Sequence, residues 1–225
     1  MKNKRIIAFI LLTLWIGCTA MAIVDGVIRP PYLIKSMIKV VFFLGLPLLV
    51  SLCGKNVRLI CFSPFPKKGL YLPLALGGGV FLLILGGYFL LQDTFDFSGI
   101  PTSLTKNVGV TKDNFFFVAI YISIVNSWLE EFFFRGFAFL TLKQYLPRMF
   151  AHVVSAFFFA FYHIAIMTGW FSPALFVLTM AALFAGGIFF NYLDEKINHI
   201  FPSWIVHLCA NLSINTIGLI LFGIY

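Results

Sequence analysis

Residues 115–142 read FFFVAIYISIVNSWLEEFFFRGFAFLTL, an apolar run that contains the adjacent carboxylates Glu130 and Glu131 and the guanidinium of Arg135. The run exceeds the roughly 20 residues that an α-helix needs to cross a bilayer. Ionisable side chains inside such a run are costly to bury and usually serve a function. Only eight residues of the chain are acidic, and two of them stand side by side here. The run therefore predicts a membrane-spanning helix that carries part of a functional site.

The composition of the whole chain is that of a helical membrane protein. Of its 225 residues 61% are hydrophobic, 29 are phenylalanine and only 11% are charged, and the mean hydropathy is +1.00. A water-soluble domain of this length needs more polar surface, and a transmembrane β-barrel would alternate apolar and polar residues. We expect an all-α fold, a polytopic transmembrane helical bundle. Its seven predicted spans are residues 6–24, 33–53, 70–91, 115–142, 151–167, 174–193 and 201–224.

The net charge of +8 comes from basic residues that lie mostly between the apolar runs. No dense basic stripe or aromatic platform accompanies them, so we expect no nucleic-acid partner. Their distribution favours contact with lipid head groups and a cytoplasmic N-terminus. The short, densely packed chain favours a multi-pass protein of the bacterial plasma membrane. The cysteines form no CxxC pair, and we expect free, structural thiols at Cys18, Cys53, Cys61 and Cys209.

The spans divide the chain into two parts. Residues 1–114 hold three N-terminal spans and a long outer loop at residues 92–114, and residues 115–225 form the catalytic helical core. The first span ends near Ala20-Met21-Ala22, which resembles a signal-peptidase site, but a retained helix fits the rest of the chain better. Small residues predict close contacts between helices at Gly77-Gly78-Gly79, Gly86-Gly87 and Gly186-Gly187.

Polar residues on three of the C-terminal helices lie at similar depths in the membrane. A helix rises about 1.5 Å per residue, so Glu130 and His163, each 12 residues from a cytoplasmic helix end, lie roughly 18 Å deep. His207 and Asn211 lie 6 and 10 residues from such an end, roughly 9 and 15 Å deep. A single intramembrane histidine or asparagine more often joins helices by hydrogen bonds. The shared depth favours one functional site.

Helical spacing assigns different neighbours to the two glutamates. Glu131 and Arg135 are four residues apart, so they lie on one helix face and can form an ion pair. Such a pair offsets part of the cost of burying either charge. Glu130 is rotated by about 100° from Glu131 and points to another neighbour. We therefore expect Glu131 to be structural and Glu130 to be free for chemistry.

Three motifs, in this order on separate helices, resemble the CAAX-protease and bacteriocin-processing family of intramembrane proteases. They are EExxxR at residues 130–135, FxxxH at residues 159–163 and HxxxN at residues 207–211. The resemblance covers roughly residues 115–215, and the ordered trio is far more specific than any one motif.

The resemblance implies a glutamic-type endopeptidase that acts on a membrane-associated protein or peptide. In that scheme Glu130, helped by His163, activates a water molecule. Preorganised N–H donors stabilise a developing oxyanion, and the resemblance assigns this role to His207 and Asn211. The supporting residues are Glu131, Arg135 and Phe159.

Alternatives to this scheme stay open. Zinc could be bound by Glu130, His163 and His207, since Glu and His are common zinc ligands. Because HExxH is absent and Asn211 would be an unusual extra ligand, we favour a reaction that requires no cofactor. The chain could also be a non-catalytic immunity or scaffold protein. A transporter would have paired repeats and broken helices, and the sequence has neither. Whether a substrate is prenylated stays open.

Overall fold

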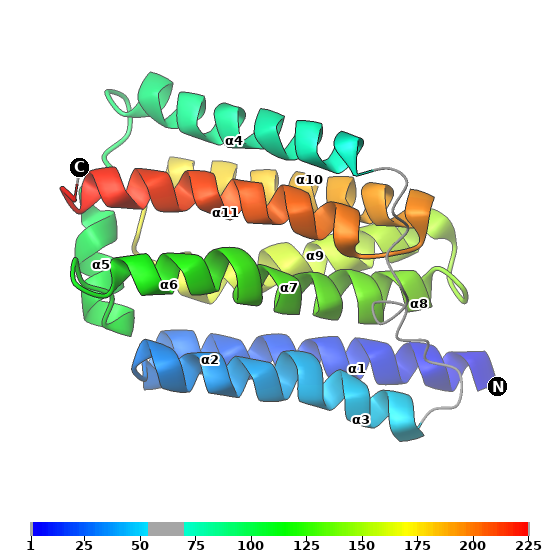
Figure 1. Cartoon of the computed structure of the whole chain (residues 1–225). Coiled ribbons are helices and arrows are strands. Elements are labelled where there is room, and N and C mark those ends of the chain that lie inside the picture. The colour runs from blue at the N-terminus through cyan, green and yellow to red at the C-terminus, as the bar shows by residue number, and fades with distance from the viewer. Residues whose placement is uncertain (1, 54–69, 225) are drawn as a thin grey trace.

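The computed structural model describes residues 2–53 and 70–224, and these residues form helices and no strand. Within them, seven helices are long and apolar enough to cross a membrane. The helices form one bundle, and the two termini lie at opposite ends of it, as seven crossings require (Figure 1). The chain is therefore a multi-pass integral membrane protein, and the predicted all-α fold with seven spans is confirmed.

The N-terminal part contains three spans, two of which include a π-helical turn. They consist of α1 (Lys2–Ile23) with η1 (Val24–Ile28), of α2 (Tyr32–Val40) with η2 (Val41–Gly45) and α3 (Leu46–Cys53), and of α4 (Tyr71–Leu91).

The predicted loop at residues 92–114 contains a short helix that we did not expect. This helix, α5 (Gly99–Val108), lies across the end of the bundle near the C-terminus (Figure 1). It is followed by Gly109, which has a left-handed backbone (φ 70°). The N–H of Gly109 bonds the carbonyl of Thr105, and the N–H of Val110 bonds that of Leu104. Its sequence, GIPTSLTKNV, is too short and too polar to give the signal of a membrane span.

The C-terminal part contains four spans, and the first of them is a single long helix in which α and π turns alternate. Its segments are α6 (Phe115–Tyr121), η4 (Ile122–Asn126), α7 (Ser127–Glu130), η5 (Glu131–Phe139) and α8 (Leu140–Leu142). The remaining spans are α9 (Arg148–Met167), α10 (Pro173–Ile197) and α11 (Phe201–Leu221).

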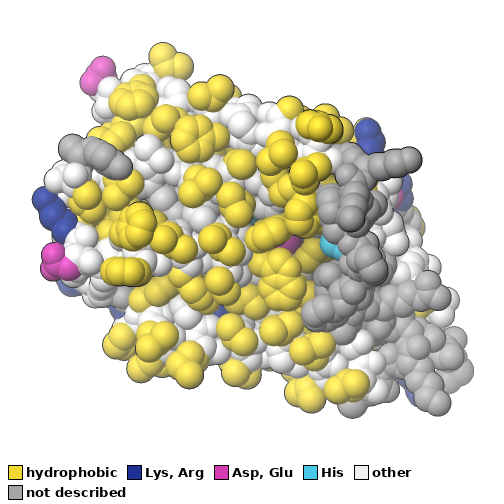
Figure 2. All heavy atoms as spheres, in the orientation of Figure 1, with side chains coloured by type: hydrophobic (Ala, Val, Ile, Leu, Met, Phe, Trp, Pro, Cys, Tyr) yellow, Lys and Arg dark blue, Asp and Glu magenta, His cyan; other side chains and the backbone are white. Residues whose placement is uncertain are grey.

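One apolar core joins the N-terminal and C-terminal spans. The α1 helix buries one face through Ile10, Leu14 and Cys18, which recur every four residues. Phe43 of η2 stacks on Phe133 of η5, with ring centroids 4.2 Å apart. Many large apolar side chains outside this core are exposed and cover the face seen in Figure 2, as expected for a surface that contacts lipid.

The glycine prediction is correct at two positions and wrong at others. A Cβ on Gly77 would lie 2.7 Å from Sγ of Cys209, so α4 packs closely on α11 there. A Cβ on Gly187 would lie 2.9 Å from Cα of Ala156, so α10 packs closely on α9. At the other predicted contacts among the described residues, no atom beyond the chain neighbours and the backbone of the same helix lies within 4 Å of the corresponding point; these are Gly78, Gly79, Gly86, Gly87 and Gly186.

This difference gives a matched pair of variants. We expect Gly187→Val to lower the free energy of unfolding by about 1–3 kcal/mol, because the new side chain overlaps the α9 backbone. Gly186→Val adds the same side chain at a point with no atom of another helix within 4 Å, and we expect little loss. Thermal unfolding in detergent measures both, and equal losses would contradict this packing.

The free-thiol prediction is confirmed for Cys18 and Cys209. Cys61 and the side chain of Cys53 lie outside the described residues.

Candidate active site

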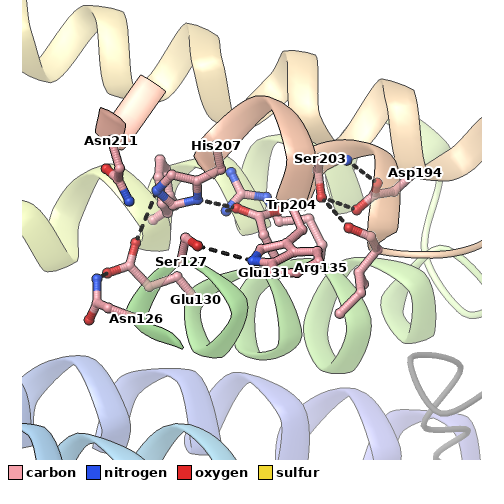
Figure 3. Close-up of polar contacts among 12 residues, drawn as sticks. Asn126, Ser127, Glu130, Glu131, Arg135, Asp194, Ser203, Trp204, His207 and Asn211 are labelled. Carbon is pink, nitrogen blue, oxygen red and sulfur yellow. Dashed lines mark hydrogen bonds and ion pairs between the residues drawn. The ribbon is translucent and has the colours of Figure 1, made fainter. Parts of the chain in front are cut away.

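Two π-helical segments, η4 and η5, flank the α7 turn that ends at Glu130. A π-helical turn widens the helix, and such turns often occur at functional sites. Carbonyls of η4 accept hydrogen bonds from α11: Asn211 Nδ2 donates to Ile122 O at 3.2 Å, and Trp204 Nε1 donates to Ile124 O at 3.2 Å. These bonds hold α11 alongside the glutamates (Figure 3).

Glu130 is buried, and its two carboxylate oxygens have different surroundings. Oε1 lies 2.5 Å from Nζ of Lys39 on α2 and 3.0 Å from Nδ2 of Asn126. Oε2 has no hydrogen-bond partner among the described residues, and it lies 3.9 Å from Nε2 of His163 and 3.7 Å from Nε2 of His207. Glu130 thus points to a different neighbour from Glu131, and we did not predict that this neighbour is Lys39, a cation supplied by α2.

Glu131 forms the predicted ion pair and a further contact that we did not predict. Its Oε1 lies 3.2 Å from Nη1 of Arg135, and both side chains are fully buried. The same oxygen lies 2.6 Å from Nδ1 of His207 (Figure 3). The guanidinium carbon of Arg135 lies 4.1 Å from the centroid of the Phe159 ring, which contacts the rings of His163 and His207. Glu131 therefore also orients a site histidine.

The two histidines present their Nε2 atoms to Glu130. Nδ1 of His163 lies 2.7 Å from the carbonyl oxygen of Phe159. Because that oxygen can only accept, Nδ1 carries a hydrogen and donates the hydrogen bond. Nδ1 of His207 faces the carboxylate of Glu131 in the same way. In neutral rings both Nε2 atoms and Oε2 of Glu130 are acceptors. Three converging acceptors suit a hydrogen-bond donor such as water.

Asn211 lies one helical turn beyond His207 on α11, and both point towards the fourth span (Figure 3). Its amide has two protons, one of which is used by the carbonyl of Ile122. The second proton is available for another acceptor on the same side as His207. The structure thus brings Glu130, His163 and His207 together and places Asn211 beside them.

A buried carboxylate that we did not predict positions α11. Asp194 near the end of α10 is fully buried, and it accepts hydrogen bonds from the backbone N–H (3.1 Å) and the hydroxyl (2.7 Å) of Ser203. These bonds fix the start of α11, and they therefore fix the position of His207 along the bundle axis. The signal was the pair of adjacent carboxylates Asp194-Glu195 at the end of an apolar run, followed by a span whose third residue is Ser203.

The zinc alternative has suitable donor types, namely Glu130, His163 and His207. The ammonium of Lys39 already pairs with one oxygen of the carboxylate. Across residues 2–53 and 70–224, no three His, Cys, Asp or Glu side chains have the geometry of a metal site.

Residues 112–213 match the family described as type II CAAX prenyl endopeptidase Rce1-like. The matched segment contains every residue of the EExxxR, FxxxH and HxxxN motifs, so these residues form a domain of that family and the predicted resemblance is confirmed. The three N-terminal spans, including Lys39, lie outside the match. No curated protein and no solved structure gives a significant match to the chain.

Proposed function

Because residues 112–213 form a domain of the Rce1-like type II CAAX prenyl endopeptidase family, we propose that the chain is an intramembrane endopeptidase. It hydrolyses a peptide bond near the C-terminus, or within a membrane segment, of a membrane-associated protein or peptide. One observation carries the proposal: a buried carboxylate oxygen of Glu130 faces Nε2 of both His163 and His207.

The first step is attack of water on the scissile carbonyl. Glu130, helped by His163, removes one proton from the water molecule while the water oxygen forms a bond to the carbonyl carbon. The π electrons of the carbonyl move to its oxygen, which becomes an oxyanion. In the second step the C=O bond re-forms and the C–N bond breaks. The leaving amine takes up the proton, which returns Glu130 to its starting form.

The partners of the two Nδ1 atoms support different roles for the two histidines. In the neutral His163 ring, Nδ1–H donates to a carbonyl, so Nε2 has a lone pair that can accept a proton. Nδ1–H of His207 faces the carboxylate of Glu131, which balances the charge when the ring carries both protons. Nε2 of that ring is then a donor for the oxyanion, beside the second amide proton of Asn211. Such donors contribute about 3 kcal/mol each in known sites.

The reaction can be tested with the purified chain in lipid nanodiscs and a set of membrane-associated peptides. In water enriched in oxygen-18, the new C-terminal carboxyl of a product gains one heavy oxygen atom, which mass spectrometry detects. Nanodiscs without the chain are the control. Binding of peptides without any cleavage would favour the non-catalytic immunity or scaffold function.

We further propose that the reaction requires no metal, because Lys39 already provides a positive charge at Glu130. We expect treatment with a strong zinc chelator, followed by its removal, to leave the initial rate of peptide cleavage unchanged. A lasting loss of activity that added zinc restores would contradict this prediction. The same treatment of a known zinc peptidase is the control.

The membrane orientation that we propose has the N-terminus in the cytoplasm of a bacterial cell. The turn between α8 and α9, with Lys143 and Arg148, lies at the same end of the bundle as the N-terminus (Figure 1). Basic residues favour the cytoplasmic side. A substrate would then reach the site from the cytoplasmic half of the membrane.

A further inference from the structure

A lysine from outside the matched family domain lies against the proposed catalytic carboxylate. Lys39 of α2 is buried (2% exposed). Its ammonium lies 2.5 Å from both Oε1 of Glu130 and Oδ1 of Asn126. It also lies 4.8 Å from the centroid of the Tyr162 ring and 5.1 Å from that of Phe43. A buried lysine in a membrane helix is costly and commonly has a functional partner.

We propose that Lys39 is a positioning residue for Glu130. It holds Oε1, so that Oε2 stays directed at Nε2 of His163 and His207. It also balances the negative charge that Glu130 needs in order to accept a proton in an apolar surrounding. This inference rests on the proposed function and deepens it, because it assigns part of the site to an N-terminal span.

Asn126 closes a triangle of polar contacts with the other two side chains. Its Oδ1 accepts from Lys39 at 2.5 Å, and its Nδ2 donates to Oε1 of Glu130 at 3.0 Å. Because the ammonium can only donate, it fixes which end of the Asn126 amide faces it. Oε1 therefore receives two donors, and rotation of the carboxylate would break both contacts. The triangle restrains the carboxylate without blocking Oε2.

A second ion pair on α2 provides a control for the stability effect alone. Lys35, one helical turn before Lys39, pairs with Asp25 of η1, whose side chain is also buried. Neither residue of this pair contacts Glu130, His163 or His207 through a described hydrogen bond or ion pair. The same substitution at Lys35 and Lys39 thus removes a cation from a buried carboxylate, but only the second carboxylate belongs to the site.

The experiment measures kcat and KM of the full chain in nanodiscs with a peptide that the wild type cleaves. We expect Lys39→Met to lower kcat about a hundred-fold, because a small misplacement of a catalytic group has an effect of this size. KM should change little, as for a residue that acts on the transition state. Lys39→Arg should restore most of kcat, because it keeps the charge. Lys35→Met should leave kcat within about two-fold of the wild type.

The outcomes separate this inference from the proposed function. Equal kcat values for Lys39→Met and Lys35→Met, with Glu130→Gln inactive, would overturn the role of Lys39 and leave the endopeptidase intact. A Glu130→Gln variant that still cleaves would overturn both. If Lys39→Met does not fold, Asn126→Ala replaces it, because it removes one donor to Oε1 and keeps the ion pair. We expect about a ten-fold loss of kcat for this variant, and an unchanged kcat would contradict the inference.

Discussion

Replacing Glu130 with glutamine should lower kcat for peptide cleavage by about 10³-fold or more, since proton transfer by a positioned side chain contributes 10²–10⁴-fold. The amide has nearly the same shape as the carboxylate and can still accept a hydrogen bond from Lys39. It cannot remove a proton from water, and its NH₂ group would donate towards the imidazoles. Product formation measured by mass spectrometry gives the rate, and thermal unfolding shows whether the variant is folded.

Glu195→Gln is the matched control for this experiment. Glu195, near the end of α10, is another glutamate in a membrane span. It pairs with the exposed Arg148 at the start of α9. We expect its kcat to stay within about two-fold of the wild type, because exposed ion pairs contribute little. A cellular phenotype that survives both Glu130→Gln and Glu130→Ala would refute the endopeptidase and favour the scaffold or immunity function.

Replacing Arg135 with methionine should lower the free energy of unfolding by about 3–5 kcal/mol, the effect of leaving one charge of a buried pair alone. Glu131 has no exposed surface, so water cannot replace the guanidinium. The rings of Phe159 and Phe190 would also lose the cation that lies against them. Reversible unfolding in mixed detergent micelles measures the loss. Arg148→Met, which removes an arginine with 66% of its side chain exposed, is the control.

A double variant separates the stability of this pair from its effect on His207. In Glu131→Gln with Arg135→Met, both charges are absent, so we expect most of the stability to return. Activity should stay low, because Nδ1 of His207 no longer faces a carboxylate. Full activity in the double variant would show that Glu131 serves the fold alone. A loss below about 1 kcal/mol in Arg135→Met would contradict the burial argument.

The sequence predicted the spans well because each is a continuous apolar run with polar residues at its ends. The fourth span, residues 115–142, has the predicted bounds, and the i, i+4 spacing predicted the pair of Glu131 and Arg135. Depth counting placed Glu130 and the histidines in one layer, and their Nε2 atoms do face its carboxylate.

Contacts between spans were harder to predict, because they depend on which face each helix turns to its neighbours. Lys39 lies in an apolar span whose sequence does not reveal that it faces Glu130. The contact of Glu131 with His207 depends on how α11 lies along the fourth span. At Gly86 and Gly87 a stripe of small residues faces open space rather than a helix, so composition alone overstates packing.

The π turns of η4 and η5 also change how the fourth span should be read. A helical wheel assumes a constant angle of about 100° between successive residues. A π turn contains more residues than an α-helical turn, so the wheel assigns residues beyond it to the wrong face of the helix. Removing a single residue from η4 would turn Glu130 by about that angle away from both histidines. A one-residue insertion or deletion between residues 122 and 130 is therefore expected to change which side chains face the histidines, and not only the length of the span.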